Sequence, residues 1–330
     1  MTCLAAWLPG LRRGSLSGKI LPKGAIDLAN AGTLRSRELM IREARTAYFF
    51  LLPSLIFFVG FVVFPMFICI FYSLTNANMN AKAATEFIGL LNFQKLLTDK
   101  TFLEALRNTF VIVIVSVPAV CAFSLWVSSA IYKLSGPVLS AFRCIFYLPV
   151  VTGSVAVTVV WKWMYDNYTG ILNFVLKGTG IIEKNINWLG DSKYALWCII
   201  VILFTTSVGQ PIVLYVSALG NVDATQIEAA KVDGATDFQV FWNVKWPQMM
   251  PTTLYILVIT TINSFQCFAL IQLLTSGGSG TNTVMYYIYF TAFKLTEQLG
   301  HFGYANAMGV VLAIFIGILS AVQFKLAEEK

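Results

Sequence analysis

Polar side chains occur within two long apolar segments of this sequence, and their types could bind a hydroxyl-rich solute. In the first segment, a Gly-x-Pro sequence at 209–211 follows two threonines and a serine, and it predicts a kink that frees backbone polar groups. In the second, residues 260, 263, 264 and 267 share one helical face because of their i, i+3, i+4, i+7 spacing. The candidate substrate-path residues are Thr205, Gly209, Gln210, Thr260, Asn263, Ser264 and Gln266.

These side chains have a second interpretation. Threonine, serine and asparagine also join neighbouring helices through interhelical hydrogen bonds, so the same faces could serve packing alone. Beside the amides and hydroxyls, Phe265 and Phe268 could stack on a solute ring. The sequence leaves solute contact and helix packing open as explanations of the two faces.

Other chemistries lack the residues that they need. The six cysteines show no CxxC spacing and His301 is the single histidine, so we predict no catalytic and no metal-ligating residues. The sequence has no Gly-x(4)-Gly-Lys-Ser/Thr phosphate loop, and we therefore expect no cofactor on this chain. The net charge of +7 does not form a basic stripe interleaved with aromatics, which argues against nucleic acid as a partner.

The elements that would position the polar side chains are membrane-spanning helices. Apolar residues make up 57% of the 330 residues and charged residues only 12%, whereas soluble domains usually carry about 25% charged residues. Charges separate uncharged runs that are long enough to cross a bilayer as helices. We predict an all-α polytopic helical bundle with spans at 48–74, 108–132, 144–161, 194–220, 252–275 and 304–324. The shorter apolar segment Val284–Phe293 is predicted to be interfacial.

Lysine and arginine set the predicted orientation of these spans. With the N-terminus inside, 14 of the 23 basic residues lie in inner segments and 9 in outer loops, with the strongest bias just before the first span. Residues 1–45 are predicted to be a basic cytoplasmic tail, 46–326 the transmembrane domain and 327–330 a second cytoplasmic tail. Both termini and the loop 221–251 are then cytoplasmic.

The loop 221–251 carries an orderly set of local signals. Asp223 with Gln226 can form an N-cap and its reciprocal partner, opening a short helix that ends at Gly234. Thr236 with Gln239 gives a second capping box and a helix that continues to about residue 245. The prolines at 247 and 251 are expected to close the loop. The loop carries four acidic residues and four aromatic residues, and a compact helix pair with charged and aromatic faces suits docking in a groove of another protein.

The same loop resembles the EAA signature of ABC-importer permeases. Glu228-Ala229-Ala230, then Gly234, then Val244-Lys245-Trp246-Pro247 have the family's spacing, with Val in place of Ile and Trp in place of Leu. The stretch 228–235 is similar to the carbohydrate-uptake branch, as in the maltose and glycerol-phosphate permeases. Further segments typical of that branch are Leu52-Pro53-Ser54, Phe64-Pro65, Arg107-Asn108-Thr109, Trp188 to Asp191, Ser264-Phe265-Gln266, Gly277-Gly278 and Phe302 to Ala305.

This resemblance, which covers about 47–326, implies a function and partners. The chain would be the permease subunit of a binding-protein-dependent importer in the bacterial plasma (inner) membrane, forming the path for a carbohydrate. A second homologous permease subunit (in a heterodimer), two ATPase subunits that use ATP and Mg, and an extracytoplasmic solute-binding protein would complete it. The residues implied in coupling to the ATPase are Glu228, Ala229, Ala230, Asp233, Gly234 and Pro247.

Two other classes of protein compete with this interpretation. An ion-coupled secondary transporter would usually place ionisable residues inside its spans, and the six predicted spans contain no Asp, Glu, Lys or Arg in their cores. An intramembrane enzyme would need paired aspartates, a histidine cluster or a Gly-x-Ser-x-Gly elbow, and none of these occurs in the spans. The secondary transporter is therefore the main alternative.

Overall fold

The structure, a computed structural model, describes residues 42–78, 85–293 and 301–328. Within these ranges the chain is helical and contains one isolated bridge, Thr75 with Phe87, in place of any strand. The predicted all-α bundle is confirmed. Most of the predicted N-terminal tail and the last two residues of the C-terminal tail lie outside the described residues.

The chain divides into two units, at Met66, and the first of them contains most of the first apolar helix. That helix runs Arg42–Ser73 and includes the π-helical turn η1 (Val59–Val63) and α2 (Phe64–Ser73). The other described helices are α3 (Leu91–Thr98), α4 (Lys100–Ile131), α5 (Gly136–Thr152), α6 (Ser154–Met164), α7 (Ile171–Gly178), α8 (Ala195–Ser207), α9 (Gly209–Gly220), α10 (Ala224–Val232), α11 (Asp237–Val240), η2 (Phe241–Lys245), α12 (Trp246–Phe265), α13 (Ala269–Leu274), α14 (Val284–Phe293) and α15 (Phe302–Glu328).

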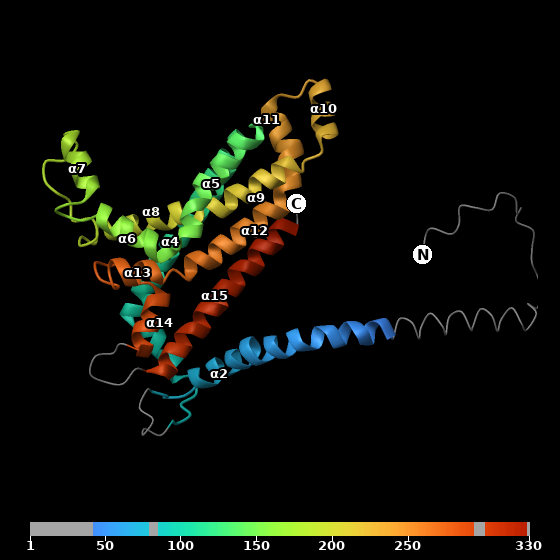
Figure 1. Cartoon of the computed structure of the whole chain (residues 1–330). Coiled ribbons are helices and arrows are strands. Elements are labelled where there is room, and N and C mark those ends of the chain that lie inside the picture. The colour runs from blue at the N-terminus through green and yellow to red at the C-terminus, as the bar shows by residue number, and fades with distance from the viewer. Residues whose placement is uncertain (1–41, 79–84, 294–300, 329–330) are drawn as a thin grey trace, which may run out of the picture. The chain divides into compact units, whose positions relative to one another are not determined.

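The second unit is organised around α4, which packs against α8, α9 and α12. Helix α12 also packs against α15, and α5 packs against α9. Figure 1 shows α10 and α11 together at one end of this unit, near the beginning of α5. We call this the loop end. The described helices include four that are long and apolar enough to cross a membrane, or up to six if each of two bent pairs is one span.

Both bent pairs have local causes. The third predicted span is α5 and α6, which meet at 96° around Gly153, where φ is 87° and α5 ends shortly after Pro149. Helix α5 begins at Gly136, ahead of the predicted start at Cys144. The fourth predicted span is α8 and α9, bent by 41° at Val208, next to the predicted Gly-x-Pro kink.

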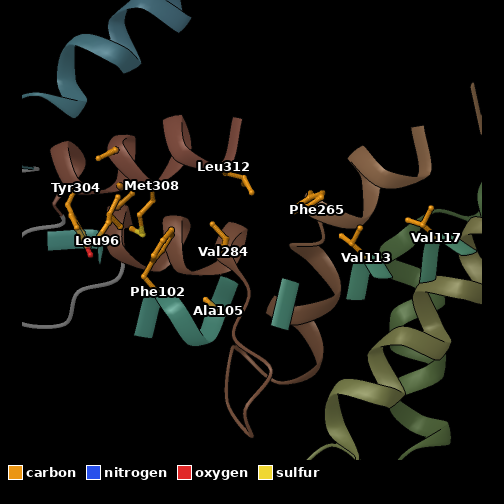
Figure 2. Packing of buried hydrophobic residues seen from close by; sticks show 13 residues of the cluster. Leu96, Phe102, Ala105, Val113, Val117, Phe265, Val284, Tyr304, Met308 and Leu312 are labelled. Atoms are coloured by element: carbon orange, nitrogen blue, oxygen red, sulfur yellow. The ribbon is translucent and has the colours of Figure 1, made fainter. Parts of the chain in front are cut away.

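The core at the end opposite the loop end joins α3, α4, α14 and α15. Figure 2 shows Leu96, Tyr304 and Met308 gathered in one place within this cluster. Phe265 is fully buried in it and meets Phe110 edge to face, with ring centroids 5.6 Å apart. The expectation that Phe265 could stack on a solute is wrong, because its ring is enclosed by the core.

Asp99 connects three helices at this same end. Its carboxylate caps α4 by accepting from the backbone N–H groups of Thr101 (2.9 Å) and Phe102 (3.2 Å). The hydroxyls of Tyr287 in α14 and Tyr304 in α15 donate to its other oxygen at 2.9 and 2.6 Å. Burial raises the pKa of Asp99, but these hydrogen bonds outweigh it and the pKa lies below its ordinary value.

We expect Asp99→Ala to destabilise the bundle by about 2 kcal/mol, because it removes a helix cap and leaves two tyrosine hydroxyls without their acceptor. Asp99→Asn keeps a capping oxygen and should lose less. Since the Asp99 pKa is lowered on folding, its contribution is present above the ordinary pKa and is lost as the pH falls through the lowered value. Thermal unfolding of the detergent-solubilised chain at neutral pH measures both variants, and equal stability of wild type and Asp99→Ala would contradict the capping role.

Candidate functional site: the exposed loop and the cavity at the helix break

The loop between α9 and α12 is held in shape by its own hydrogen bonds. Asp223 caps α10 by accepting from the backbone N–H of Thr225 at 2.9 Å, and the Thr225 hydroxyl donates to the same oxygen at 2.8 Å. These two hydrogen bonds from Thr225 lower the pKa of Asp223. The N-cap predicted at Asp223 is confirmed.

The turn after α10 depends on Gly234. Its φ is +83°, and its N–H donates to the Lys231 carbonyl at 3.0 Å while the Ala235 N–H donates to the Ala230 carbonyl at 2.9 Å. Such left-handed residues commonly end helices, and glycine adopts this conformation without steric cost. The predicted glycine bend is confirmed.

The second helix of the loop begins with the predicted capping box. The Thr236 hydroxyl accepts from the Gln239 N–H at 3.4 Å, and the Gln239 side-chain oxygen accepts from the Thr236 N–H at 2.8 Å. From there the helix continues through the π-turn η2 and α12 to Phe265, and a short break at 266–268 separates it from α13. The prediction that the prolines close the loop is wrong, because both lie within this helix: Pro247 is the second residue of α12, directly after the π-turn, and Pro251 follows four residues later.

Three hydrogen bonds connect the loop to the spans. Gln248 in α12 donates to the Gln226 side-chain oxygen at 2.8 Å and accepts from the Asp223 N–H at 3.4 Å. The predicted reciprocal bond from Gln226 to Asp223 is therefore wrong, since Gln248 has that role. Lys245 in η2 donates to the Tyr132 hydroxyl at the end of α4, at 2.7 Å.

The outer face of this loop is exposed and partly apolar. Helix α10 buries none of its side chains. Val232 is 88% exposed, Phe238 72% and Trp242 46%, and the rings of Phe238 and Trp242 are neighbours with centroids 6.1 Å apart. An ordered pair of helices with exposed apolar and aromatic side chains is a surface suited to docking against another protein.

A second feature is a cavity of about 160 Å³ at the break between α8 and α9. Thr206, Ser207 and Gln210 line it from the broken pair, and Thr260 and Asn263 line it from α12. Val150 of α5 completes one wall. Polar groups that face a cavity beside a broken helix are the usual arrangement of a membrane substrate site.

The predicted substrate-path residues separate into two groups. Gln210, Thr260 and Asn263 meet at this cavity. Ser264 instead pairs with Ser116 of α4 at 3.1 Å, and the Thr205 hydroxyl donates to the Ile202 carbonyl at 2.8 Å within its own helix.

Gly209 and Gln266 also lie outside the lining of the cavity. Gly209 is buried at the closest approach of α9 to α5: a Cβ at this position would lie 2.3 Å from the Phe146 carbonyl oxygen. Gln266 caps α12 at the break before α13 and is exposed. Thr206, Ser207 and Pro211 belong to the segment noted in the sequence but not to the candidate set, and the cavity residues that sequence reasoning missed are Val150, Leu214 and Ile259.

A bundle of apolar helices with two broken pairs, a polar cavity at one break and a docking loop at one end defines a polytopic membrane transport subunit. Residues 100–328 match the family described as Binding-protein-dependent transport system inner membrane component. The chain belongs to this family, and it is a multi-pass permease subunit of an ABC importer in the bacterial inner membrane. The resemblance based on the loop signature is thereby confirmed.

Individual relatives agree with this membership. The chain is 31% identical over 295 residues to the multiple sugar-binding transport system permease protein MsmF of Streptococcus mutans, covering 88% of this chain and 98% of the relative. It is 29% identical over 288 residues to the lactose transport system permease protein LacF of Rhizobium radiobacter, covering 86% and 94%. The crystal structure of a bacterial ABC transporter that imports the acidic polysaccharide alginate has the same fold, with a TM-score of 0.74 at 21% identity, covering 89% of this chain and 99% of the other.

Proposed function

We propose that this permease forms part of the import path for a carbohydrate and couples to a separate ATPase through the loop 221–251. The observation that carries the proposal is that α10 is capped and turned by internal hydrogen bonds yet buries none of its side chains. A helix with this degree of local order, whose side chains are left largely exposed, is suited to docking against a partner protein. Relatives named for sugar and lactose transport support a carbohydrate as the solute.

The proposed assembly holds this chain, a second homologous permease subunit, two ATPase subunits and an extracytoplasmic solute-binding protein. ATP and Mg would bind to the ATPase subunits and not to this chain. The loop end and both termini would face the cytoplasm, as the Lys and Arg distribution predicts. Within this chain, Glu228, Ala229, Ala230, Asp233, Gly234 and Pro247 would form or position the docking surface.

The cavity gives the proposed path its chemistry. The side-chain amides of Gln210 and Asn263 and the hydroxyl of Ser207 can donate to and accept from sugar hydroxyls. The Thr206 hydroxyl donates to the Ile202 carbonyl at 3.0 Å and can accept a hydrogen bond from the solute. Asn263 is exposed to the cavity, so its hydrogen-bonding groups are available to a solute. Thr205, Gly209, Ser264 and Gln266 would support the path through packing and helix geometry.

The test is reconstitution of the complete transporter in proteoliposomes with its binding protein and a panel of radiolabelled oligosaccharides. We expect ATP-dependent uptake of at least one carbohydrate. Asn263→Ala should lower that uptake about tenfold, because two hydrogen bonds to the solute are lost. Ser264→Ala is the matched control on the same turn, since Ser264 contacts Ser116 and does not line the cavity. ATP-independent uptake, or unchanged uptake by Asn263→Ala, would contradict the proposal.

A further inference from the structure

A groove between α5 and α9 lies next to the cavity and has a volume of about 490 Å³. Ser140, Arg143 and Tyr147 line it from α5, and Gln210 lines it from α9. Gln210 also lines the cavity that contains Asn263. The groove and the cavity are therefore neighbours, because Gln210 lines both. A solute bound at Gln210 would lie next to the groove and next to the cavity.

Among the residues that line this groove, Arg143 alone is charged, and it is also the single charged residue of α5. Its side chain is half-buried, and its Nε atom is buried without a hydrogen-bond partner. Among the residues that the structure describes, no carboxylate pairs with its guanidinium; the ion pair found there joins Lys231 to Asp237. An unneutralised guanidinium in an otherwise apolar membrane helix is costly and marks a functional position.

The backbone around Arg143 is held in place by close packing. One turn further along α5, the Phe146 carbonyl lies so close to Gly209 that no side chain fits between them. Because Gly209 precedes Gln210, this contact fixes α5 and α9 with Arg143 and Gln210 on the walls of the same groove. The charge is thus carried by a rigid element beside uncharged hydrogen-bonding groups.

We propose that Arg143 binds an anionic group of the transported solute, so that the substrates include acidic carbohydrates, with a carboxylate as the preferred group. The planar guanidinium matches a carboxylate with two parallel hydrogen bonds, while Gln210, Tyr147 and Ser140 supply neutral partners for the neighbouring hydroxyls. A lipid headgroup would need the charge but not the neutral hydrogen-bonding groups of Gln210, Tyr147 and Ser140. The inference rests on the proposed carbohydrate path and specifies its substrate class.

The experiment compares an anionic solute with its neutral ester and with a solute that carries a different anionic group. Galacturonate oligosaccharides of two to four units, their methyl esters and a phosphorylated hexose are tested for ATP-dependent uptake by the reconstituted transporter. The vesicles are prepared once with neutral lipid alone and once with added anionic lipid. We expect uptake of the free acid to exceed uptake of the ester, in both lipid compositions, and Arg143→Gln to reduce the acid-to-ester ratio about tenfold. Arg143→Lys keeps the positive charge but loses the planar guanidinium with its paired donors. Its acid-to-ester uptake ratio should lie between those of wild type and Arg143→Gln.

Lys133→Gln is the matched control, because Lys133 is an exposed basic residue in the turn just before α5 and lines neither the groove nor the cavity. It should leave the acid-to-ester ratio unchanged. The assignment is overturned if Arg143→Gln leaves the acid-to-ester uptake ratio unchanged or lowers uptake of the acid and the ester equally. It is also overturned if uptake of the acid requires anionic lipid. Preferred uptake of the phosphorylated hexose would show that the preferred anionic group is a phosphate and not a carboxylate. ATP-dependent uptake of neutral sugars alone would refute the acidic substrate while leaving the permease function intact.

Discussion

Gly234→Val is expected to reduce ATP-dependent uptake at least about tenfold while the chain still inserts into the membrane. The φ of +83° at Gly234 is in the left-handed region, where a β-branched residue costs roughly 1–2 kcal/mol, and about 1.4 kcal/mol already changes an equilibrium tenfold. No atom lies within 4 Å of a Cβ built at this position, so the effect is one of backbone conformation and not of steric overlap with a neighbour. Insertion depends on the apolar helices, which the substitution does not touch.

Gly234→Asn is the matched variant, because asparagine tolerates the left-handed conformation better than any β-branched residue does. It should retain most of the uptake. Glu228→Lys tests the docking surface without backbone strain, since Glu228 is exposed on α10 and the change only reverses its charge. The measurements are membrane levels, co-purification with the ATPase subunits and uptake in proteoliposomes. Wild-type uptake by both Gly234→Val and Glu228→Lys, at normal membrane levels, would show that this loop does not couple to the ATPase.

The parts of this loop that could be predicted from the sequence are those whose partners are close in the chain. Asp223 with Thr225, Thr236 with Gln239, and the turn at Gly234 each involve residues within five positions of one another. The contact between Gln226 and Gln248 joins residues 22 positions apart, and Lys245 with Tyr132 joins residues 113 positions apart. Capping rules describe local geometry, so they assigned Gln226 to the wrong partner.

The candidate path shows the same limit. Thr260, Asn263 and Ser264 were correctly placed near one another on a helix, but spacing does not reveal which neighbour each side chain meets. Ser264 meets Ser116 from α4, whereas Asn263 opens onto a cavity formed with α9. The third predicted span begins at Cys144, directly after Arg143, because charges usually end apolar runs. The structure places Arg143 within α5, where the helix begins at Gly136.

Gly209→Ala is expected to have the second large effect, on stability and assembly of the bundle. A Cβ at Gly209 would lie 2.3 Å from the Phe146 carbonyl oxygen and 3.1 Å from a methyl of Val150. The carbonyl belongs to the α5 backbone and cannot rotate away as a flexible side chain would. Helices α5 and α9 would have to separate, at a cost of about 1–3 kcal/mol for overpacking. The movement would also shift Gln210 and Val150, which line the cavity, so uptake should fall together with stability.

Gly220→Ala on the same helix separates this packing effect from the general effect of replacing a helical glycine. No atom lies within 4 Å of a Cβ built at Gly220, and alanine there should be neutral or stabilise α9 by up to about 1 kcal/mol. Thermal unfolding in detergent and uptake in proteoliposomes, measured for both variants, give the comparison. We expect Gly209→Ala to unfold at a lower temperature than wild type and Gly220→Ala to match it or exceed it. Equal stability of the two variants would mean that α5 and α9 do not need the close approach at Gly209, and that this contact does not hold Arg143 beside Gln210.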